Sequence, residues 1–454
     1  MMTDSISQNP SREDYQIRFF FLFVLLIPVW WIIGLNWLIF QLFTFFLLID
    51  FVQRQKRSPI PIKLPVQFIF LVLFIVLYGV SILVNIRNIP PSRILASFNN
   101  LSFWMMGFIL LFVLDRTFRW EGIKKIILSV HILGFFSSLF CIFGLVLWLF
   151  TNKFYQFESV LAGFLPKSFL EMLYSRAHIL YSSLVHTVVG RDRLFDAYVP
   201  RVVGFHVYAT AFAMASVIFM TMTLIYFLLN KKQKWILIVL VLECIAFVFS
   251  FSRTAILGII LAGSVVCFLA YHNRKWMRVA VIVCLIAALL FIVVVSPSKM
   301  IETASGFRKG STFWRARLYS ITVEQALKKP ILGWGFKPKT EEFQMPIGSH
   351  STYLGVFYRT GCVGFFVFCL FWYYVVKRWW ELRKTFILNK GTTYVWIITG
   401  TALITGLLWM LTDDLDAPPL TAFLYFILIG IIFGLQKLKN QADSLAQIQT
   451  DLNP

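Results

Sequence analysis

Residues 203–250 read VGFHVYATAFAMASVIFMTMTLIYFLLNKKQKWILIVLVLECIAFVFS, and their pattern decides the fold. Two long apolar runs, 203–229 and 234–250, are separated by a short connection that is rich in lysine. Runs of about 20 apolar residues match the thickness of a bilayer's hydrocarbon core when they form α-helices. A helix also satisfies its backbone hydrogen bonds internally, as a segment in lipid must. Both runs are therefore predicted to be transmembrane helices.

Runs of the same kind recur along the 454 residues, of which 59% are hydrophobic and 14% are charged. One soluble core cannot bury that much apolar surface, so a soluble fold is excluded. The chain is predicted to be an all-α polytopic membrane protein with about twelve transmembrane helices. A kinked re-entrant pair is an alternative for the first two runs, which are split near Asn36. The predicted runs are 18–34, 36–53, 64–86, 100–115, 124–150, 203–229, 234–250, 254–271, 277–296, 352–376, 394–412 and 417–436.

The net charge of +21 is spread over short basic clusters between the apolar runs. This distribution is typical of membrane orientation signals and does not form the single basic face of a nucleic-acid-binding domain. Basic clusters follow the even-numbered runs, whereas the opposite loops are poor in charge or acidic, as at Asp413, Asp414 and Asp416. The positive-inside rule then places both termini in the cytoplasm and residues 151–202 and 297–351 outside.

These predictions divide the chain into five parts. The membrane parts are 1–150 with helices one to five, 203–296 with helices six to nine, and 352–454 with the last three helices and a cytoplasmic tail. Between them lie the extracytoplasmic segment 151–202 and the extracytoplasmic loop 297–351, which is the predicted catalytic loop. An amphipathic run after Pro166 predicts a helix at the membrane surface, either as a structural lid or in contact with a substrate.

Basic residues also gather in the outer loop 297–351, against the positive-inside trend. A bound anion would explain them, and so would a solvated basic loop that is attracted to lipid headgroups. The residues are Arg308, Lys309, Arg315, Arg317, Lys328 and Lys329.

Arg253 joins two apolar runs without any real loop, which places its guanidinium at the outer membrane boundary. Arginine keeps its charge there, so it needs an anionic partner or water. Its planar fork of donors suits a diphosphate, which accepts charge-assisted hydrogen bonds in pairs. Snorkelling of the side chain to the interface is the alternative.

His350 precedes the run 352–376 on the same predicted side as Arg253. An imidazole with an ordinary pKa of about 6.5 suits proton transfer near neutral pH. Alone, a histidine at the start of a helix is also a common cap or core residue. The histidines show no pair with metal-ligand spacing, so neither a metal nor another cofactor is expected.

Several elements of the second half resemble the O-antigen ligase and O-antigen polymerase superfamily. His350-Ser351, nine further residues and then Gly361-Cys362-Val363-Gly364 are similar to the signature His-[Asn/Ser/Gln]-x9-Gly-x-x-Gly of that family. The turn 330–335, PILGWG, resembles its Pro-x-x-Gly-x-Gly turn, with Arg315 fifteen residues upstream. Ser252-Arg253-Thr254 resembles its Ser-Arg element, and 201–205, RVVGF, a weaker one. Relatives often carry Asn and Pro after that last element, where this chain has His206-Val207-Tyr208.

The resemblance implies a glycosyltransferase of the bacterial cytoplasmic (inner) membrane that acts in cell-surface polysaccharide ligation or polymerisation. The implied donor is a glycan on a polyprenyl (undecaprenyl) diphosphate, and the implied acceptor is a hydroxyl of a glycan, lipid or protein. His350 is the implied general base of an inverting, metal-independent transfer on the extracytoplasmic side. The implied diphosphate ligands are Arg253 and Arg315, with Arg308 and Arg317 as further candidates, and Arg201, Ser351 and Tyr353 are candidate substrate contacts.

Two other classes of function remain open from the sequence. A transporter or flippase of an anionic lipid-linked substrate also uses arginine within a membrane, but it should show two related halves with paired broken spans. Here the polar candidates gather in the second half and on one predicted side. A structural polytopic scaffold would need neither His350 nor Arg253.

Overall fold

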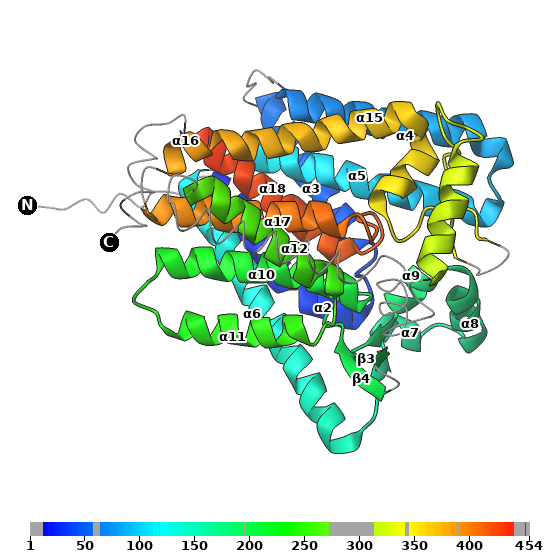
Figure 1. Ribbon diagram of the computed structural model, residues 1–454, viewed down its shortest axis with the longest axis horizontal. Coiled ribbons are helices and arrows are strands. Elements are labelled where there is room, and N and C mark those ends of the chain that lie inside the picture. The colour runs from blue at the N-terminus through cyan, green and yellow to red at the C-terminus, as the bar shows by residue number, and fades with distance from the viewer. Residues whose placement is uncertain are drawn as a thin grey trace, which may run out of the picture.

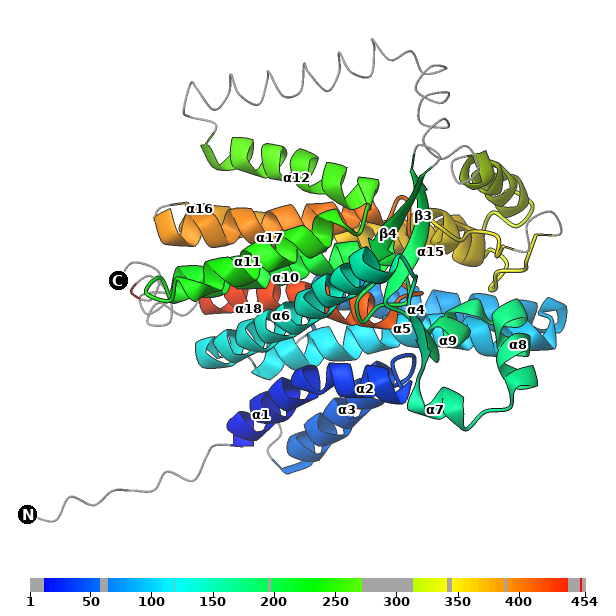
Figure 2. The same cartoon turned by 90° about the horizontal axis from the view of Figure 1, so that it is seen from below.

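The long helices of the chain form one bundle in which they run roughly along a common axis (Figures 1 and 2). This computed structural model describes residues 12–57, 64–117, 119–194, 197–271, 313–340, 345–387, 390–439 and 450. The helices of the bundle are α1 (Arg12–Leu25), α2 (Ile27–Ile33), α3 (Ile39–Arg57), α4 (Val66–Asn85), α5 (Pro91–Thr117), α6 (Trp120–Thr151), α10 (Ala209–Leu229), α11 (Trp235–Val248), α12 (Arg253–Tyr271), α15 (Thr352–Glu381), α16 (Arg383–Phe386), α17 (Lys390–Trp409) and α18 (Pro419–Lys439).

Within the described ranges, eight helices are long and apolar enough to cross a membrane, or nine if the bent pair α1 and α2 forms one span. The other predicted runs give weaker candidates, because α11 has only 14 residues and α3 carries charged residues toward its end. The predicted run 277–296 lies outside the described residues. The chain is thus helical and rich in candidate spans, and the count of about twelve stays a prediction.

The first predicted run is bent rather than straight. Its two parts, Tyr15–Leu25 and Ile27–Ile33, meet at an angle of 49°. Pro28 lies in the first turn of α2, and a proline has no N–H with which to continue a helical hydrogen-bond ladder. This kink falls inside the first run. The structure also has the expected break near Asn36, because α2 ends at Ile33 and α3 begins at Ile39.

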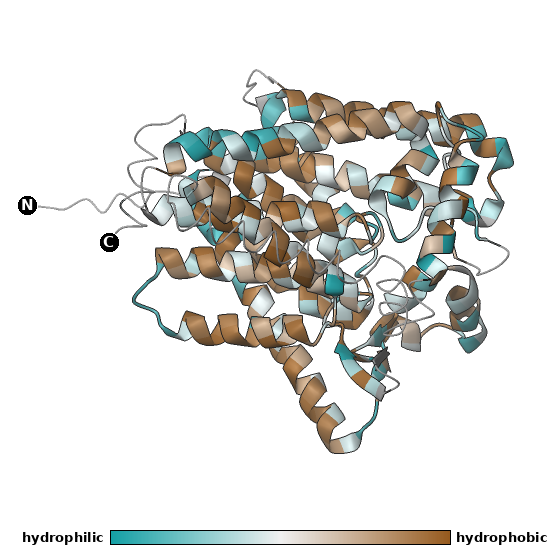
Figure 3. Cartoon of the chain, viewed as in Figure 1, coloured by the Kyte–Doolittle hydropathy of each residue, from teal (hydrophilic) through white to brown (hydrophobic). Residues whose placement is uncertain are grey.

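Helix α18 forms the centre of the bundle. Its most apolar stretch is 94% buried, compared with 28% for α12, which lies at the periphery. Apolar residues fill the length of the bundle, and hydrophilic residues gather toward its two ends (Figure 3). This distribution fits helices whose middle sections face lipid or each other.

Short elements cover one end of the bundle, on the right in Figure 1. They include two antiparallel hairpins, one of β1 (Gln156–Glu158) with β2 (Val185–Thr187) and one of β3 (Val189–Leu194) with β4 (Ala197–Val202). The short helices there are α7 (Val160–Gly163), α8 (Lys167–Arg176) and α9 (His178–Ser182). We call this the loop end, and we call the opposite end, with α16 and the 230–234 connection, the basic end. The hairpins correct the all-α prediction, which had no strands.

Helix α8 begins directly after Pro166, as the amphipathic pattern predicted. Its apolar residues Leu170 and Leu173 pack with Ala162 and Leu184 in a small core of their own. The helix therefore buries its apolar face against α7 and the segment before β2. Its position at a membrane surface stays a prediction.

Helix α15 is broken at Gly361, whose φ of 66° lies in the left-handed region. The turn 330–335 packs into this break. The N–H groups of Trp334 and Gly335 donate to the carbonyls of Tyr358 (3.0 Å) and Arg359 (2.9 Å). The break exposes these carbonyls because the helical ladder that would use them is interrupted.

Both glycine motifs are needed for this close approach. A Cβ on Gly361 would lie 2.2 Å from the carbonyl oxygen of Ile331, and a Cβ on Gly333 would lie 2.5 Å from the carbonyl carbon of Arg359. The turn 330–335 and the Gly-x-x-Gly stretch 361–364 are thus two halves of one contact. This contact fixes the helix that covers residues 313–326 relative to the start of α15.

A buried ion pair joins α15 to the connection between α17 and α18. Arg359 and Asp416 are each 1% exposed, and their Nη1 and Oδ2 atoms are 2.5 Å apart. Arg359 also donates to the hydroxyl of Tyr78 (2.9 Å), and Trp104 donates to Asp416 (3.3 Å). Because buried charges are tolerated only when paired and hydrogen-bonded, this network holds α4, α5, α15 and the 410–418 connection in one arrangement.

Replacement of Gly361 by Ala is expected to lower the free energy of unfolding by about 2 kcal/mol or more, through the left-handed φ and the contact with Ile331. The measurement is the apparent Tm of the purified protein in detergent. Gly263→Ala in α12 is the control, because its new Cβ meets only a methyl group of Thr401 at 3.7 Å. Equal Tm values for the two variants would contradict the packing of turn 330–335 into the break.

Candidate active site

His350 ends the loop that leads into α15, and its backbone has a φ of 62°. A non-glycine residue in this region is strained by about 1–3 kcal/mol and is held there by its surroundings. Here the N–H donates to Oδ2 of Asp414 (3.2 Å), and the carbonyl accepts from the hydroxyl of Tyr319 (2.5 Å). The position of His350 is therefore set by two other segments, the 410–418 connection and the helix over 313–326.

The next residues anchor the start of α15. The hydroxyl of Ser351 accepts from the N–H of Leu354 (3.3 Å) as an N-cap. Thr352 donates its N–H and its hydroxyl to the carbonyl of Asp413, at 3.0 and 2.8 Å. The hydroxyl of Tyr353 donates to the carbonyl of Leu407 (3.1 Å). Ser351 and Tyr353, two candidate substrate contacts, thus hold structural hydrogen bonds here.

Two aspartates of the 410–418 connection lie beside these residues. Asp414 forms an ion pair with Lys337 (3.0 Å), and both side chains are largely buried. Asp413 is buried, and its Oδ1 accepts from the hydroxyl of Thr210 (3.0 Å). Its Oδ2 is buried without a hydrogen-bond partner among the groups that the structure describes.

Burial raises the pKa of Asp413 to about 7, against the opposing effect of Arg315 and Arg201. This carboxyl therefore changes its protonation near neutral pH. Sequence reasoning used Asp413 and Asp414 only as a sign of the outer side of the membrane. The available signal was the density of aspartate in a short loop between two apolar runs, residues 413–416.

Three arginines share this neighbourhood. Burial lowers the pKa of Arg201 to about 10; Asp413 opposes this shift, and the positive charges of Arg315 and Arg253 add to it. Arg201 on β4 donates its Nε–H to the carbonyl of Ser250 (2.6 Å), just before Arg253 at the start of α12. The structure thus brings Arg201, Arg253 and Arg315 within electrostatic reach of one another, and Arg201 and Arg315 within reach of Asp413.

The helix over 313–326 presents one face to this cluster. Tyr319 and Thr322 follow Arg315 by four and seven residues, which places all three on one side of a helix. Tyr319 contacts the carbonyl of His350, and the hydroxyl of Thr322 accepts from the N–H of Gly348 (2.9 Å). Arg317 is exposed and lies about 200° around the same helix. Arg308, the remaining candidate, lies outside the described residues.

Burial lowers the pKa of His350 below its ordinary value. The positive charges of Arg315 and Lys337 act in the same direction, and Asp414 opposes them. The imidazole is therefore neutral at pH 7 and able to accept a proton.

The cluster combines three guanidinium groups, a neutral imidazole and a carboxyl that titrates near neutral pH. Such a set can hold a multiply charged anion by bidentate hydrogen bonds and can take a proton from a group beside it.

Residues 236–369 match a family model described as O-antigen ligase. The matched region contains Arg253, Arg315, His350 and both glycine motifs, whereas Arg201 and the 410–418 connection lie outside it. No curated protein sequence matches the chain.

The protonation of His350 gives a direct test of this geometry. In a pH titration by NMR of histidine-labelled protein, assigned with His350→Gln, we expect its pKa below 6.5. Arg315→Gln removes a positive charge and should raise this pKa, and Asp414→Asn removes a negative charge and should lower it. If the pKa of His350 does not change in Arg315→Gln, the two side chains are not close to each other and the geometry is contradicted.

Proposed function

We propose that the chain, whose residues 236–369 match the O-antigen ligase family, transfers a glycan from a polyprenyl diphosphate carrier to an acceptor hydroxyl. The observation that supports this proposal most is the position of Arg315. Its charge acts on both His350 and Arg253, the two residues that the proposed reaction needs together.

The arginines have the chemistry to hold the leaving group. The bond that breaks joins the anomeric carbon of a sugar to a diphosphate, and the electron pair of that bond leaves with the diphosphate. Guanidinium forks stabilise this developing charge by paired, charge-assisted hydrogen bonds. We assign this role to Arg253 and Arg315, with Arg201 beside them. The reaction so described requires no metal ion.

His350 is the proposed general base. Its neutral imidazole takes the proton of the acceptor hydroxyl as the oxygen attacks the anomeric carbon. Attack on the face opposite the diphosphate inverts that centre. Asp414 and Tyr319 act as positioning residues, because they hold the backbone of His350 and do not themselves exchange the proton.

Asp413 is proposed to change the charge of the site when the donor binds. Burial raises its pKa, and an arriving diphosphate would favour its protonated form further. Proton uptake by this carboxyl would remove a negative charge from beside the phosphates. The donor would thus meet three arginines with less opposing charge.

We place the site on the extracytoplasmic face of the bacterial inner membrane and both termini in the cytoplasm. The support is that the candidate residues lie at the loop end, whereas the lysine-rich 230–234 connection and α16 lie at the opposite end (Figure 1). Basic connections of this kind face the cytoplasm by the positive-inside rule. The acceptor, a glycan, lipid or protein, then decides between ligation and polymerisation.

His350→Ala is expected to reduce transfer by about 10²–10⁴-fold, the usual contribution of a general base. The assay incubates purified protein with a polyprenyl-diphosphate oligosaccharide and candidate acceptors and identifies the product by mass. His178→Ala is the control, since His178 is an exposed histidine of α9. Normal transfer by His350→Ala in protein of normal Tm would remove His350 from the mechanism.

Arg253→Lys and Arg315→Lys keep the charge and lose the planar fork, so each should lower kcat/KM by about tenfold or more. Arg317→Lys changes the same chemistry on the other face of the helix and should leave transfer near the wild-type rate. The comparison is made in the same mass assay over a range of donor concentrations. Full activity of Arg253→Lys would indicate that Arg253 only snorkels to the membrane interface.

A further inference from the structure

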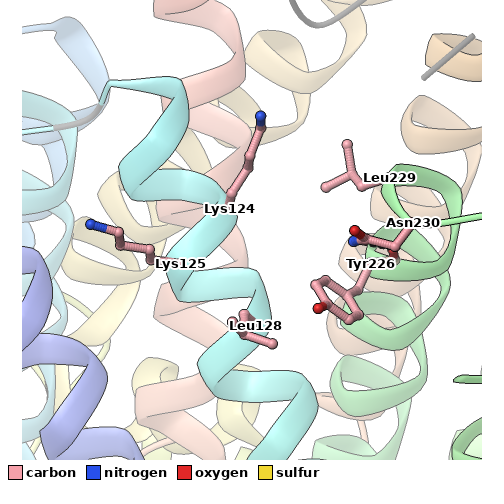
Figure 4. A pocket seen from close by; sticks show the side chains of 6 residues that line it. All are labelled: Lys124, Lys125, Leu128, Tyr226, Leu229 and Asn230. Atoms are coloured by element: carbon pink, nitrogen blue, oxygen red, sulfur yellow. Dashed lines mark hydrogen bonds between the residues drawn. The ribbon is translucent and has the colours of Figure 1, made fainter. Parts of the chain in front are cut away.

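A pocket lies at the basic end of the bundle, between the start of α6 and the end of α10 (Figure 4). Its volume is about 330 Å³. We call it the basic pocket, and its lining consists of Lys124, Lys125, Leu128, Tyr226, Leu229 and Asn230.

The basic pocket lies at the level where two candidate spans begin and end. Lys124 and Lys125 belong to the first turns of the span Trp120–Thr151, and Asn230 directly follows the span Ala209–Leu229. Trp120 and Trp235 lie at the ends of α6 and α11 beside it. Tryptophan is enriched at membrane interfaces, where lipid headgroups meet the hydrocarbon. The pocket is thus at headgroup depth.

The lining is divided between positive and apolar groups. Lys124 and the amide of Asn230 supply donors, and Leu128, Leu229 and the ring of Tyr226 supply apolar surface. Lys125 also lines the pocket, but its ammonium group points to the other side of α6 (Figure 4). The lysine-rich connection 231–234 adds exposed positive charge next to Asn230. This combination suits a molecule with an anionic head and a hydrocarbon tail.

The acidic contact of Lys124 does not block such a ligand. Its Nζ is 3.1 Å from Glu121, whose side chain is 63% exposed. Exposed ion pairs between residues three apart contribute little to stability, so a phosphate can replace the carboxylate.

The floor of the pocket is held by buried polar contacts. The ring of Tyr226 stacks on His131 with the centroids 4.9 Å apart. His131 contacts the hydroxyl of Thr223 (2.8 Å), which donates to Glu243 (2.9 Å). These contacts join α6, α10 and α11 beneath the pocket, so its walls have a fixed spacing.

We propose that the basic pocket binds an anionic glycerophospholipid of the bilayer. The phosphate lies at Lys124 and Asn230, and an acyl chain runs along Leu128 and Leu229. A lipid fits better than a free phosphate, because half of the lining is apolar and the pocket is at headgroup depth. This site is separate from the candidate active site and does not depend on the proposed transfer reaction.

The test measures lipid binding to the purified full-length protein in a neutral detergent by native mass spectrometry. Phosphatidylglycerol should bind, and phosphatidylcholine with the same acyl chains should bind much more weakly. Lys124→Gln should bind the first phosphatidylglycerol about fivefold more weakly, from the usual attraction of one lysine to an anionic lipid. Leu128→Trp, which fills the pocket and keeps every charge, should weaken binding as well.

The matched control is Lys377→Gln, which removes the same charge from α15 at the same end of the bundle. It should bind phosphatidylglycerol like the wild type. Equal losses in Lys124→Gln and Lys377→Gln, or no loss in Lys124→Gln, would overturn the proposal. Equal binding of the two lipids would also overturn it. Displacement of phosphatidylglycerol by millimolar inorganic phosphate would instead indicate a site for a free anion and would contradict the role of the apolar lining.

Discussion

The buried ion pair between Arg359 and Asp416 is the interaction on which the candidate active site depends. Each side chain is 1% exposed, so neither charge is tolerated without the other. The pair ties the middle of α15 to the connection between α17 and α18. Because that connection also carries Asp413 and Asp414, it brings both carboxyl groups to the start of α15. Asp414 then holds the strained backbone of His350 through its N–H.

The second constraint comes from glycine. The turn 330–335 enters the break in α15 only because Gly333 and Gly361 have no Cβ. This contact sets the helix over 313–326, and with it Arg315, against the segment that ends at His350. The candidate active site is therefore built from distant stretches that meet at one end of the bundle: β4, the start of α12, the helix over 313–326, the 345–351 loop and the 410–418 connection. The backbone of these segments is held in place by hydrogen bonds from neighbouring side chains such as Asp414 and Tyr319.

The positions of the helices were predictable from the sequence because each long apolar run indicates a segment that lies in the membrane as a helix. Helices occur in every predicted run that the structure describes, and α8 begins after Pro166 as expected. The bend at Leu26 was missed. The hairpins of 156–202 were also missed, because short strands among polar loops show only a weak alternation of apolar and polar residues. Arg359 was passed over as part of an apolar run, since its partner Asp416 is distant in sequence.

The types of residue in the candidate site were predictable from the sequence, but not every residue that belongs to it. Arg253, Arg315 and His350 were selected because they share one predicted side and match family motifs. In the structure the charge of Arg315 acts on both of the others, and the roles of the three residues stay predictions. Helical spacing alone could have distinguished Arg315 from Arg317. Tyr319 and Thr322 lie on the same side of the helix as Arg315, whereas Arg317 lies on the other side. The part played by Asp413 and Asp414 needed the fold, because a carboxylate beside an imidazole is a tertiary contact that no local pattern reports.

We propose that the cluster of charged side chains at the loop end binds a diphosphate. The most direct measurement is an experimental structure of the protein bound to undecaprenyl diphosphate. The account predicts phosphate oxygens at about 3 Å from the guanidinium groups of Arg253 and Arg315, with the imidazole of His350 beside the position of the missing sugar. A diphosphate bound elsewhere, with these two arginines turned into the lipid headgroup region, would contradict it.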